Sequence, residues 1–363
     1  MKKIAKLTSW VLLIILAFTF ALSGCGKKET PQQTVEPSES STPAGNETVG
    51  ADFGEYSATH PLELKSASYG KGEKNYHNRA SNHFSEALVE AFGGAVDVKV
   101  YNDGLLAAND RELLDGLKMG SWDIGYNNTG VMSNYNEKYA ILDLPYLFRD
   151  YDHVNAFLQS DLAEELCTLL TDQNVVTLAI AFYGFRNTAL TDAPVVVPED
   201  LNGVLIRVME SDYYVKAFRA FGAEPQSMAA SEIITALQQG TIEAVENSNN
   251  IFLNSGHYEF CPYLSKTEHV GGFYGINIAK ATWDKMTPDM QALAKQVALE
   301  VAMEESLLNE ETADKNEASL IEKGMTVNEV EKDKFIEKCA GIYEEFNGKF
   351  GSDWYDAIVA MAK

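Results

Sequence analysis

One arginine of this chain stands inside an apolar run. Arg207 interrupts the segment 204–209, whose other members are valine, leucine, isoleucine and methionine. Burying a guanidinium group is costly unless an anionic partner meets it. Further along the chain, Glu246 and Asn247 end a second apolar patch. Because a buried guanidinium and a nearby amide can together hold a carboxylate, this pattern indicates a binding site for a small organic anion.

Strand-like and helix-like segments alternate along the part of the chain that carries this pattern. Apolar residues in alternating or continuous runs predict strands, and apolar residues at helical spacing predict helices. The predicted strands cover 62–67, 96–101, 122–125, 175–181, 204–209, 244–246 and 325–330, and the predicted helices cover 80–91, 113–117, 213–221, 232–239 and 287–323. This alternation predicts an α/β fold with a mainly parallel sheet. The last helix exceeds an ordinary globular helix and is long enough to cross between two domains.

The N-terminus carries a processing signal. Lysines near the start precede an apolar segment at 10–22, which is too short for a comfortable transmembrane helix. The segment ends in Leu22-Ser23-Gly24-Cys25, which resembles a bacterial lipobox. These features predict a signal peptide at 1–24 and lipidation of Cys25, which would anchor the protein to the outside of the cell membrane. A plain signal anchor with a chance cysteine is the alternative.

Composition sets further limits. Residues 25–60 are poor in large apolar side chains and rich in Ser, Thr, Pro, Glu and Gly, so we interpret them as a lipidated N-terminal tether.

The formal net charge of −24 argues against nucleic acid and against an anionic membrane surface as partners. Besides Cys25 the chain has Cys167, Cys261 and Cys339, which allow at most one disulfide and lack the paired spacing of a metal site. No metal and no cofactor is predicted.

Four pieces of the chain form a recognisable series of motifs; they are Asp143-Leu144-Pro145-Tyr146-Leu147-Phe148, the segment 200–203 leading into Ile206-Arg207-Val208, Phe221-Gly222-Ala223, and the segment 236–240 followed by Glu246-Asn247. In these motifs, their order and their spacing, the chain from about residue 62 onward resembles the solute-binding subunits of tripartite ATP-independent periplasmic (TRAP) transporters, the DctP-like family. The resemblance implies a two-lobe periplasmic-binding-protein-like α/β fold with crossing strands and a long interlobe helix. Lobe I would hold 61–184 with 273–312, and lobe II would hold 185–272 with 313–363.

The resemblance also implies which residues bind the ligand. Arg207 would grip a ligand carboxylate, and the other expected contacts are Arg186, Asn247, Asn127, Asn128, Asn75 and His77. Each has a structural alternative: a structural ion pair for Arg207, a surface charge for Arg186, and caps or turns for the asparagines. Many relatives carry an aromatic residue near the position of Ala230, where this chain has none. The pocket is therefore expected to be wider, or to be closed by Tyr213, Tyr214 or Tyr183.

The resemblance favours one ligand class and leaves rivals open. The segment 255–261 with Thr267-Glu268-His269 is more similar to the sugar-acid (uronate) branch than to the dicarboxylate branch, and His257 and His269 are more often structural than a metal pair. The implied function is capture of an organic acid and its delivery to an ion-gradient-driven membrane permease. Binding of a C4-dicarboxylate or another monocarboxylate is the alternative within the family.

Other classes of protein remain as alternatives. A secreted enzyme acting on an acidic sugar would need paired acid and base groups, for which Glu210 and Asp212 are the nearest candidates. An adhesin or scaffold lipoprotein would not need an arginine in an apolar run. No nucleophile elbow, zinc-protease motif or P-loop is present in the sequence, so no catalytic residue is predicted.

Overall fold

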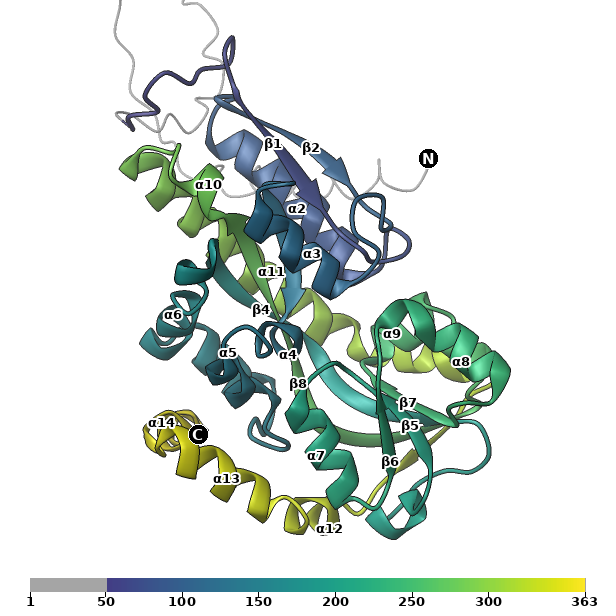
Figure 1. Ribbon diagram of the computed structural model, residues 1–363. Helices are drawn as coiled ribbons and strands as arrows, with labels where there is room; N and C mark the ends of the chain where they lie inside the picture. The colour runs from purple at the N-terminus through teal and green to yellow at the C-terminus, as the bar shows by residue number, and fades with distance from the viewer. Residues whose placement is uncertain (1–50, 363) are drawn as a thin grey trace, which may run out of the picture. The chain divides into compact units, whose positions relative to one another are not determined.

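One mixed β-sheet organises the described part of the chain (Figure 1). A computed structural model describes residues 51–362, which belong to one compact unit. The predicted signal peptide, Cys25 and most of the tether lie outside these residues. The strand order is β2-β1-β3-β8-β4-β7-β5-β6, with β9 beside β8. The strands are β1 (Leu62–Ala67), β2 (Val96–Tyr101), β3 (Ile124–Asn128), β4 (Val175–Leu190), β5 (Leu205–Val208), β6 (Glu224–Ser227), β7 (Ala244–Asn247), β8 (Tyr263–Ala279) and β9 (Thr326–Glu329).

The prediction of a mainly parallel sheet is wrong at the centre of the sheet. The outer pairs β1–β2, β1–β3, β5–β6 and β5–β7 are parallel, but β4 and β8 run antiparallel to each other and to β7 and β3 respectively. Strand β4 is also far longer than the predicted 175–181, because it passes through a bulge between Phe182 and Gly184 and continues to Leu190. Gly184 has φ of 116°, a backbone conformation that residues with a side chain rarely adopt. The two long strands therefore connect both ends of the sheet.

Local sequence explains where the helices begin. Asn75 caps α2 by accepting from the backbone N–H of His77, and Asn109 caps α3 by accepting from that of Glu112. Thr287 caps α11, which has proline at its first position. The α-helices are α2 (Tyr76–Ala91), α3 (Asp110–Met119), α4 (Thr129–Met132), α5 (Tyr151–Leu158), α6 (Asp161–Cys167), α7 (Asp212–Ala220), α8 (Ile233–Gln239), α9 (Asn249–Asn254), α10 (Lys280–Trp283), α11 (Pro288–Glu322), α12 (Lys332–Glu337), α13 (Ala340–Phe350) and α14 (Asp353–Met361).

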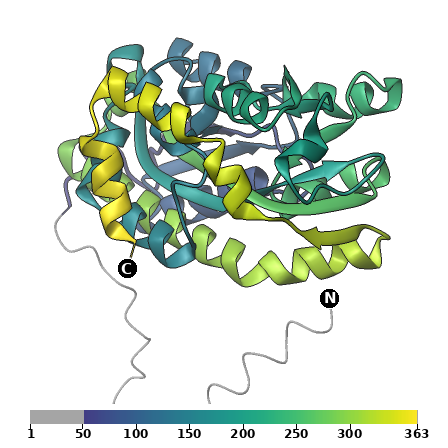
Figure 2. The same cartoon turned by 90° about the horizontal axis from the view of Figure 1, so that it is seen from below.

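The 35-residue helix α11 joins the two ends of the sheet (Figures 1 and 2). It packs against β4, against α2 at one end of the sheet and against α9 at the other. At the β4 bulge, the Ser306 hydroxyl accepts from Phe182 N at 3.0 Å, and Asn309 Nδ2 donates to Phe182 O at 3.1 Å. The prediction of a long helix that crosses between two parts is confirmed.

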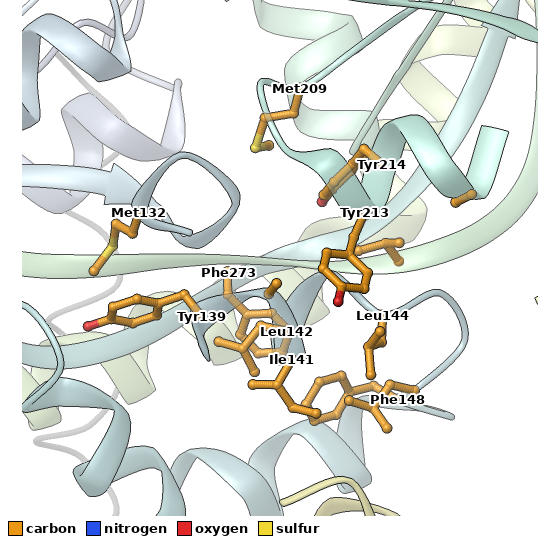
Figure 3. Packing of buried hydrophobic residues seen from close by; sticks show 14 of the residues in the cluster. Met132, Tyr139, Ile141, Leu142, Leu144, Phe148, Met209, Tyr213, Tyr214 and Phe273 are labelled. Carbon is orange, nitrogen blue, oxygen red and sulfur yellow. The ribbon is translucent and has the colours of Figure 1, made fainter. Parts of the chain in front are cut away.

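A hydrophobic core lies against the crossing strands. Figure 3 shows Phe273 of β8 near Ile141 and Leu142, with Tyr213 of α7 close by. The C-terminal helices cover this core and touch α7 and α5: Phe346 of α13 packs edge-on against Tyr213 of α7, and the Ile358 carbonyl of α14 lies 2.7 Å from His153 Nε2 of α5.

Among the described residues, Cys167, Cys261 and Cys339 are free thiols. Within 51–362, no helix combines the length and apolar character needed to span a membrane.

Candidate ligand-binding site

A cavity of about 350 Å³, lined by both polar and apolar side chains, lies where several strands end. Asn128 is the last residue of β3, Asn247 is the last of β7, and Arg207 is the third of the four residues of β5. Residues near the starts of α2 and α3 line one side, and residues of α8, α9 and the following turn line the other. Carboxyl ends of strands are the usual place for a ligand in α/β sheets. The cavity therefore collects polar groups from both ends of the sheet.

Arg207 lines this cavity without a carboxylate partner. The residue is 3% exposed. Its Nε and Nη2 both donate to the Met228 carbonyl, at 3.0 and 2.8 Å, and no ion pair is made to it within residues 51–362. Burial lowers the pKa of Arg207 below its ordinary value. A buried cation that faces a cavity and lacks a counter-charge is a site for an anion.

Arg186 is engaged quite differently. It is 1% exposed, so the surface-charge alternative is wrong. Two of its N–H groups donate to the Glu246 carboxylate, at 2.6 and 2.8 Å, and a third donates to the Glu246 carbonyl at 3.0 Å. The remaining two donate to Asn247 Oδ1 at 3.1 Å and to the Tyr183 hydroxyl. Because a guanidinium has only five donors, all of them are used inside the protein.

Glu246 provides the negative charge of this pair. Burial alone would raise its pKa, but the Arg186 charge and the neighbouring His269 outweigh burial and bring the pKa to about 2. His269 Nε2 lies 3.4 Å from Glu246 Oε2, and its Nδ1 lies 2.8 Å from the Thr267 hydroxyl. His269 therefore has a structural role beside the Arg186–Glu246 ion pair.

Asn247 offers a free donor to the cavity. Its Oδ1 accepts from Arg186 Nη1 at 3.1 Å and from Ser248 N at 2.9 Å. Those two contacts fix the amide orientation, and its Nδ2 has no hydrogen-bond partner among the described residues. Arg186 therefore acts as the group that orients Asn247.

Asn128 and Asn127 surround a carboxylate that the sequence analysis missed. The predicted strand 122–125 in fact continues through Asn128, whose Nδ2 donates to Asp110 Oδ2 at 2.7 Å. Asn127 Nδ2 donates to Asp110 Oδ1 at 2.7 Å, but Asn127 does not line the cavity. Asp110 does line it. Burial raises the pKa of Asp110 to about 6, although hydrogen bonds from both asparagines and Tyr69 act in the opposite direction. Asp110 is the first residue of α3, which follows strand β2, and this position was the signal in the sequence that could have identified it.

Asn75, the N-cap of α2, and His77, which lies in the first turn of α2 and not in the loop before it, both line the cavity. The Asn75 side-chain oxygen is used for the α2 cap, which leaves its Nδ2 without a partner among residues 51–362. His77 stacks on Tyr76 with ring centroids 3.9 Å apart, and the tilted ring of Tyr69 lies 4.3 Å away. Neither of its ring nitrogens has a hydrogen-bond partner among the described residues.

The aromatic wall differs from the one suggested by the sequence. Ala230 lines the cavity, but Tyr183, Tyr213 and Tyr214 do not. Tyr183 and Tyr214 lie against the Arg186 guanidinium, at 5.8 and 5.2 Å from their ring centroids, and support the ion pair instead. The tyrosines that line the cavity are Tyr69 and Tyr76. A metal site is not indicated, since no group of three or more His, Cys, Asp or Glu is placed to hold an ion within 51–362.

Two long crossing strands, a helix that contacts both ends of the sheet, and a cavity lined from both ends of the sheet are the features of a periplasmic-binding-protein fold. The chain matches bacterial extracellular solute-binding protein family 7 (DctP) over residues 67–349, and it belongs to that family. It is therefore an extracytoplasmic solute-binding protein of the TRAP transporter type, a class of non-enzymatic transport components.

Individual relatives agree with this assignment. A solute-binding protein of Chromohalobacter salexigens is 29% identical over 269 residues, which cover 74% of this chain and 80% of that protein. A TRAP periplasmic solute-binding protein from a Bordetella species, with density assigned as pantoate, is 27% identical with a TM-score of 0.80, covering 83% of this chain and 100% of that one. One from Pseudomonas putida F1 with bound D-glucuronate is 27% identical with a TM-score of 0.79, covering 83% and 98% respectively.

Proposed function

We propose that this protein captures a sugar acid such as a uronate outside the cytoplasm and delivers it to an ion-gradient-driven TRAP permease. The observation that carries the proposal is Arg207, a buried guanidinium that lines the cavity with no carboxylate partner in the described residues. A planar guanidinium fits a carboxylate in a bidentate manner, and such a charge-assisted contact contributes about 1.5–3 kcal/mol.

The other cavity groups suit the uncharged part of such a ligand. The Nδ2 atoms of Asn247 and Asn75 are donors without partners, and they would bind ligand oxygens. Asp110 would accept from a ligand hydroxyl, and when ionised it would repel a second ligand carboxylate. Asn128 and Arg186 also line the cavity, but the donors of Arg186 are all used inside the protein, so Arg186 acts by orienting Asn247. Asn127 does not line the cavity and orients Asp110. The D-glucuronate bound to the Pseudomonas relative has this combination of one carboxylate and several hydroxyls.

The proposed capture mechanism depends on two lobes. Lobe I would comprise 61–184 with 273–312, and lobe II would comprise 185–272 with 313–363. A ligand that contacts both lobes stabilises the closed arrangement by shifting the population toward it. The bulge of β4 at Gly184 is the place where the connecting strand would bend.

We also propose that Cys25 is lipidated and that 25–60 tether the binding unit to the membrane. Replacing Cys25 with alanine should release the protein from the membrane fraction into the soluble fraction. Retention of the Cys25→Ala variant in membranes would rule out the anchor.

Thermal unfolding with a panel of acids tests the proposed ligand class. A ligand that binds only the native protein raises the melting temperature as its concentration increases. The panel would contain uronates, aldonates, pantoate, C4-dicarboxylates, 2-oxo acids and neutral sugars. A shift with uronates or aldonates supports the proposal, and a shift confined to C4-dicarboxylates replaces the ligand class while keeping the transport role. The absence of a shift with any acid contradicts capture of a small organic anion.

A further inference from the structure

Two buried histidines face the same cavity from opposite sides. His77 belongs to the first turn of α2, and His257 begins the short 3-10 helix at His257–Glu259. Both line the cavity together with Arg207. They come from the two segments that we assign to different lobes. A ligand that fills the cavity would therefore lie between them.

Both imidazoles carry polar atoms that the protein does not satisfy. His77 Nδ1, His77 Nε2 and His257 Nδ1 are buried and have no hydrogen-bond partner in the described part of the chain. Leaving a buried polar group unpaired costs about 1–3 kcal/mol, and native structures rarely keep such groups without a use. Aromatic packing holds both rings in place: His77 stacks on Tyr76, and His257 packs edge-on against Phe252 with centroids 6.0 Å apart.

Both rings are neutral at physiological pH. Burial lowers the pKa of His77 to about 3. Burial also lowers the pKa of His257 to about 3, and the positive charges of Arg207 and Arg186 act in the same direction. A neutral imidazole has one N–H donor and one acceptor nitrogen. An alcohol hydroxyl also donates and accepts, whereas a carboxylate only accepts.

We infer that His77 and His257 are specificity residues that bind hydroxyl groups of the ligand, one from each side of the cavity. The ligand class is then an acid with several hydroxyls, because Arg207 supplies a buried cation that has no carboxylate partner within 51–362, and a hydroxyl group can pair with a neutral imidazole in either tautomer. This inference rests on the proposed function, and it deepens it by favouring acids that carry hydroxyls at those positions.

The inference predicts opposite effects on stability and on binding. Replacing either histidine with phenylalanine keeps an aromatic ring of similar size and removes unsatisfied polar atoms. The ligand-free melting temperature of His77→Phe and His257→Phe should therefore stay the same or rise. Affinity for D-glucuronate should fall about tenfold in each variant, because one ligand hydroxyl loses its partner. A histidine with only a structural role would instead give a lower melting temperature.

Titration calorimetry with D-glucuronate as the probe, on the full chain, separates the possible outcomes. His77→Gln and His257→Gln retain a donor and an acceptor and should bind more tightly than the phenylalanine variants. His60→Phe is the matched control, since His60 is exposed and does not line the cavity. Wild-type affinity in both phenylalanine variants overturns the role of the histidines and leaves the proposed function intact. No binding of D-glucuronate or any other polyhydroxy acid by the wild-type protein overturns the inference and the proposed ligand class together.

Discussion

Arg186 and Glu246 form a buried ion pair with two direct hydrogen bonds between their charged groups, from Nε to Oε2 at 2.6 Å and from Nη2 to Oε1 at 2.8 Å. The pair has a consequence for Arg207. Glu246 is committed to one arginine, so the other arginine keeps its charge unpaired beside the cavity. The two arginines are both buried, yet they have separate tasks: Arg186 builds the site, and Arg207 is available to a ligand.

Replacing each arginine with alanine should separate these tasks. Arg186→Ala leaves Glu246 as an isolated buried charge, and we expect the free energy of unfolding to fall by about 3–5 kcal/mol. Arg207→Ala removes a cation that has no counter-charge, so ligand-free stability should change by less than about 1 kcal/mol. Urea unfolding without ligand measures both values. Equal losses of stability in the two variants would show that Arg207 is also a structural residue.

Asp143 should make the protein less stable as pH rises. Burial raises the pKa of this carboxyl group to about 7 from an ordinary 3.8, although the hydrogen bond from Ser211 and the Arg186 charge oppose the change. The folded protein therefore holds a proton that the unfolded chain releases between these pH values. Its contribution is complete below the unfolded pKa and disappears as pH approaches the folded pKa, a loss of roughly 4 kcal/mol. Asp110 acts in the same direction up to about pH 6.

The variant Asp143→Asn tests this assignment. Asparagine keeps an acceptor for the Ser211 hydroxyl, which lies 2.7 Å from Asp143 Oδ2, but it does not titrate. Unfolding free energies measured from pH 4 to pH 7 should fall less steeply for Asp143→Asn than for the wild type. The exposed Asp152→Asn is the control and should follow the wild type. A wild-type slope in Asp143→Asn would contradict the buried titration.

Asp110→Asn should change ligand preference. The substitution removes a negative charge from the cavity wall and weakens the acceptor for a ligand hydroxyl. We expect affinity for D-glucuronate to fall about tenfold and discrimination against succinate to decrease, because the repulsion of a second carboxylate is lost. Calorimetry with both acids measures the ratio, with the exposed Asp97→Asn as the control. An unchanged ratio would remove Asp110 from the list of specificity residues.

Gly272→Ala should disturb the crossing strands next to the ion pair. A Cβ atom at this position would meet Tyr183 Cζ at 2.4 Å and the Gly184 carbonyl at 2.9 Å. Overpacking of this kind costs about 1–3 kcal/mol of unfolding free energy. Gly341→Ala is the control, because nothing lies within 4 Å of its added Cβ. Helix propensity should make that control neutral or slightly more stable. A wild-type melting temperature for Gly272→Ala would show that the strands adjust freely.

Elements whose signals are local in the sequence were predictable. Strand 62–67 and the helix at 287–323 agree with β1 and α11 within one residue at each end. The long central strands were not predictable in the same way. The apolar first half of β4 was predicted as 175–181, but Gly184, Arg186 and Asn187 interrupt its second half. Strand β8 contains Gly271 and Gly272 with several polar residues, so it lacks the continuous apolar run of a buried strand. In the folded protein, β4 pairs with β8 and packs against α11, and these tertiary contacts accommodate the glycine and polar residues of the two strands.

Parts of the site also depended on long-range pairing. The sequence marked Arg207 through its apolar neighbours, and Asn247 through its motif. It could not show that Glu246 binds Arg186, a residue 60 positions away. Nor could it show that Asp110 is drawn into the cavity wall by Asn127 and Asn128 at the end of β3. The pairing register of the strands decides which of these side chains meet.

A crystal structure of the protein with the acid that gives the largest thermal shift would test the role of Arg207 most directly. We predict that both oxygens of the ligand carboxylate lie about 2.7–2.9 Å from guanidinium nitrogens of Arg207, while Arg186 keeps its bonds to Glu246. A ligand carboxylate bound elsewhere in the cavity, for example at Lys71, which also lines it, with Arg207 still bonded only to Met228, would contradict the account.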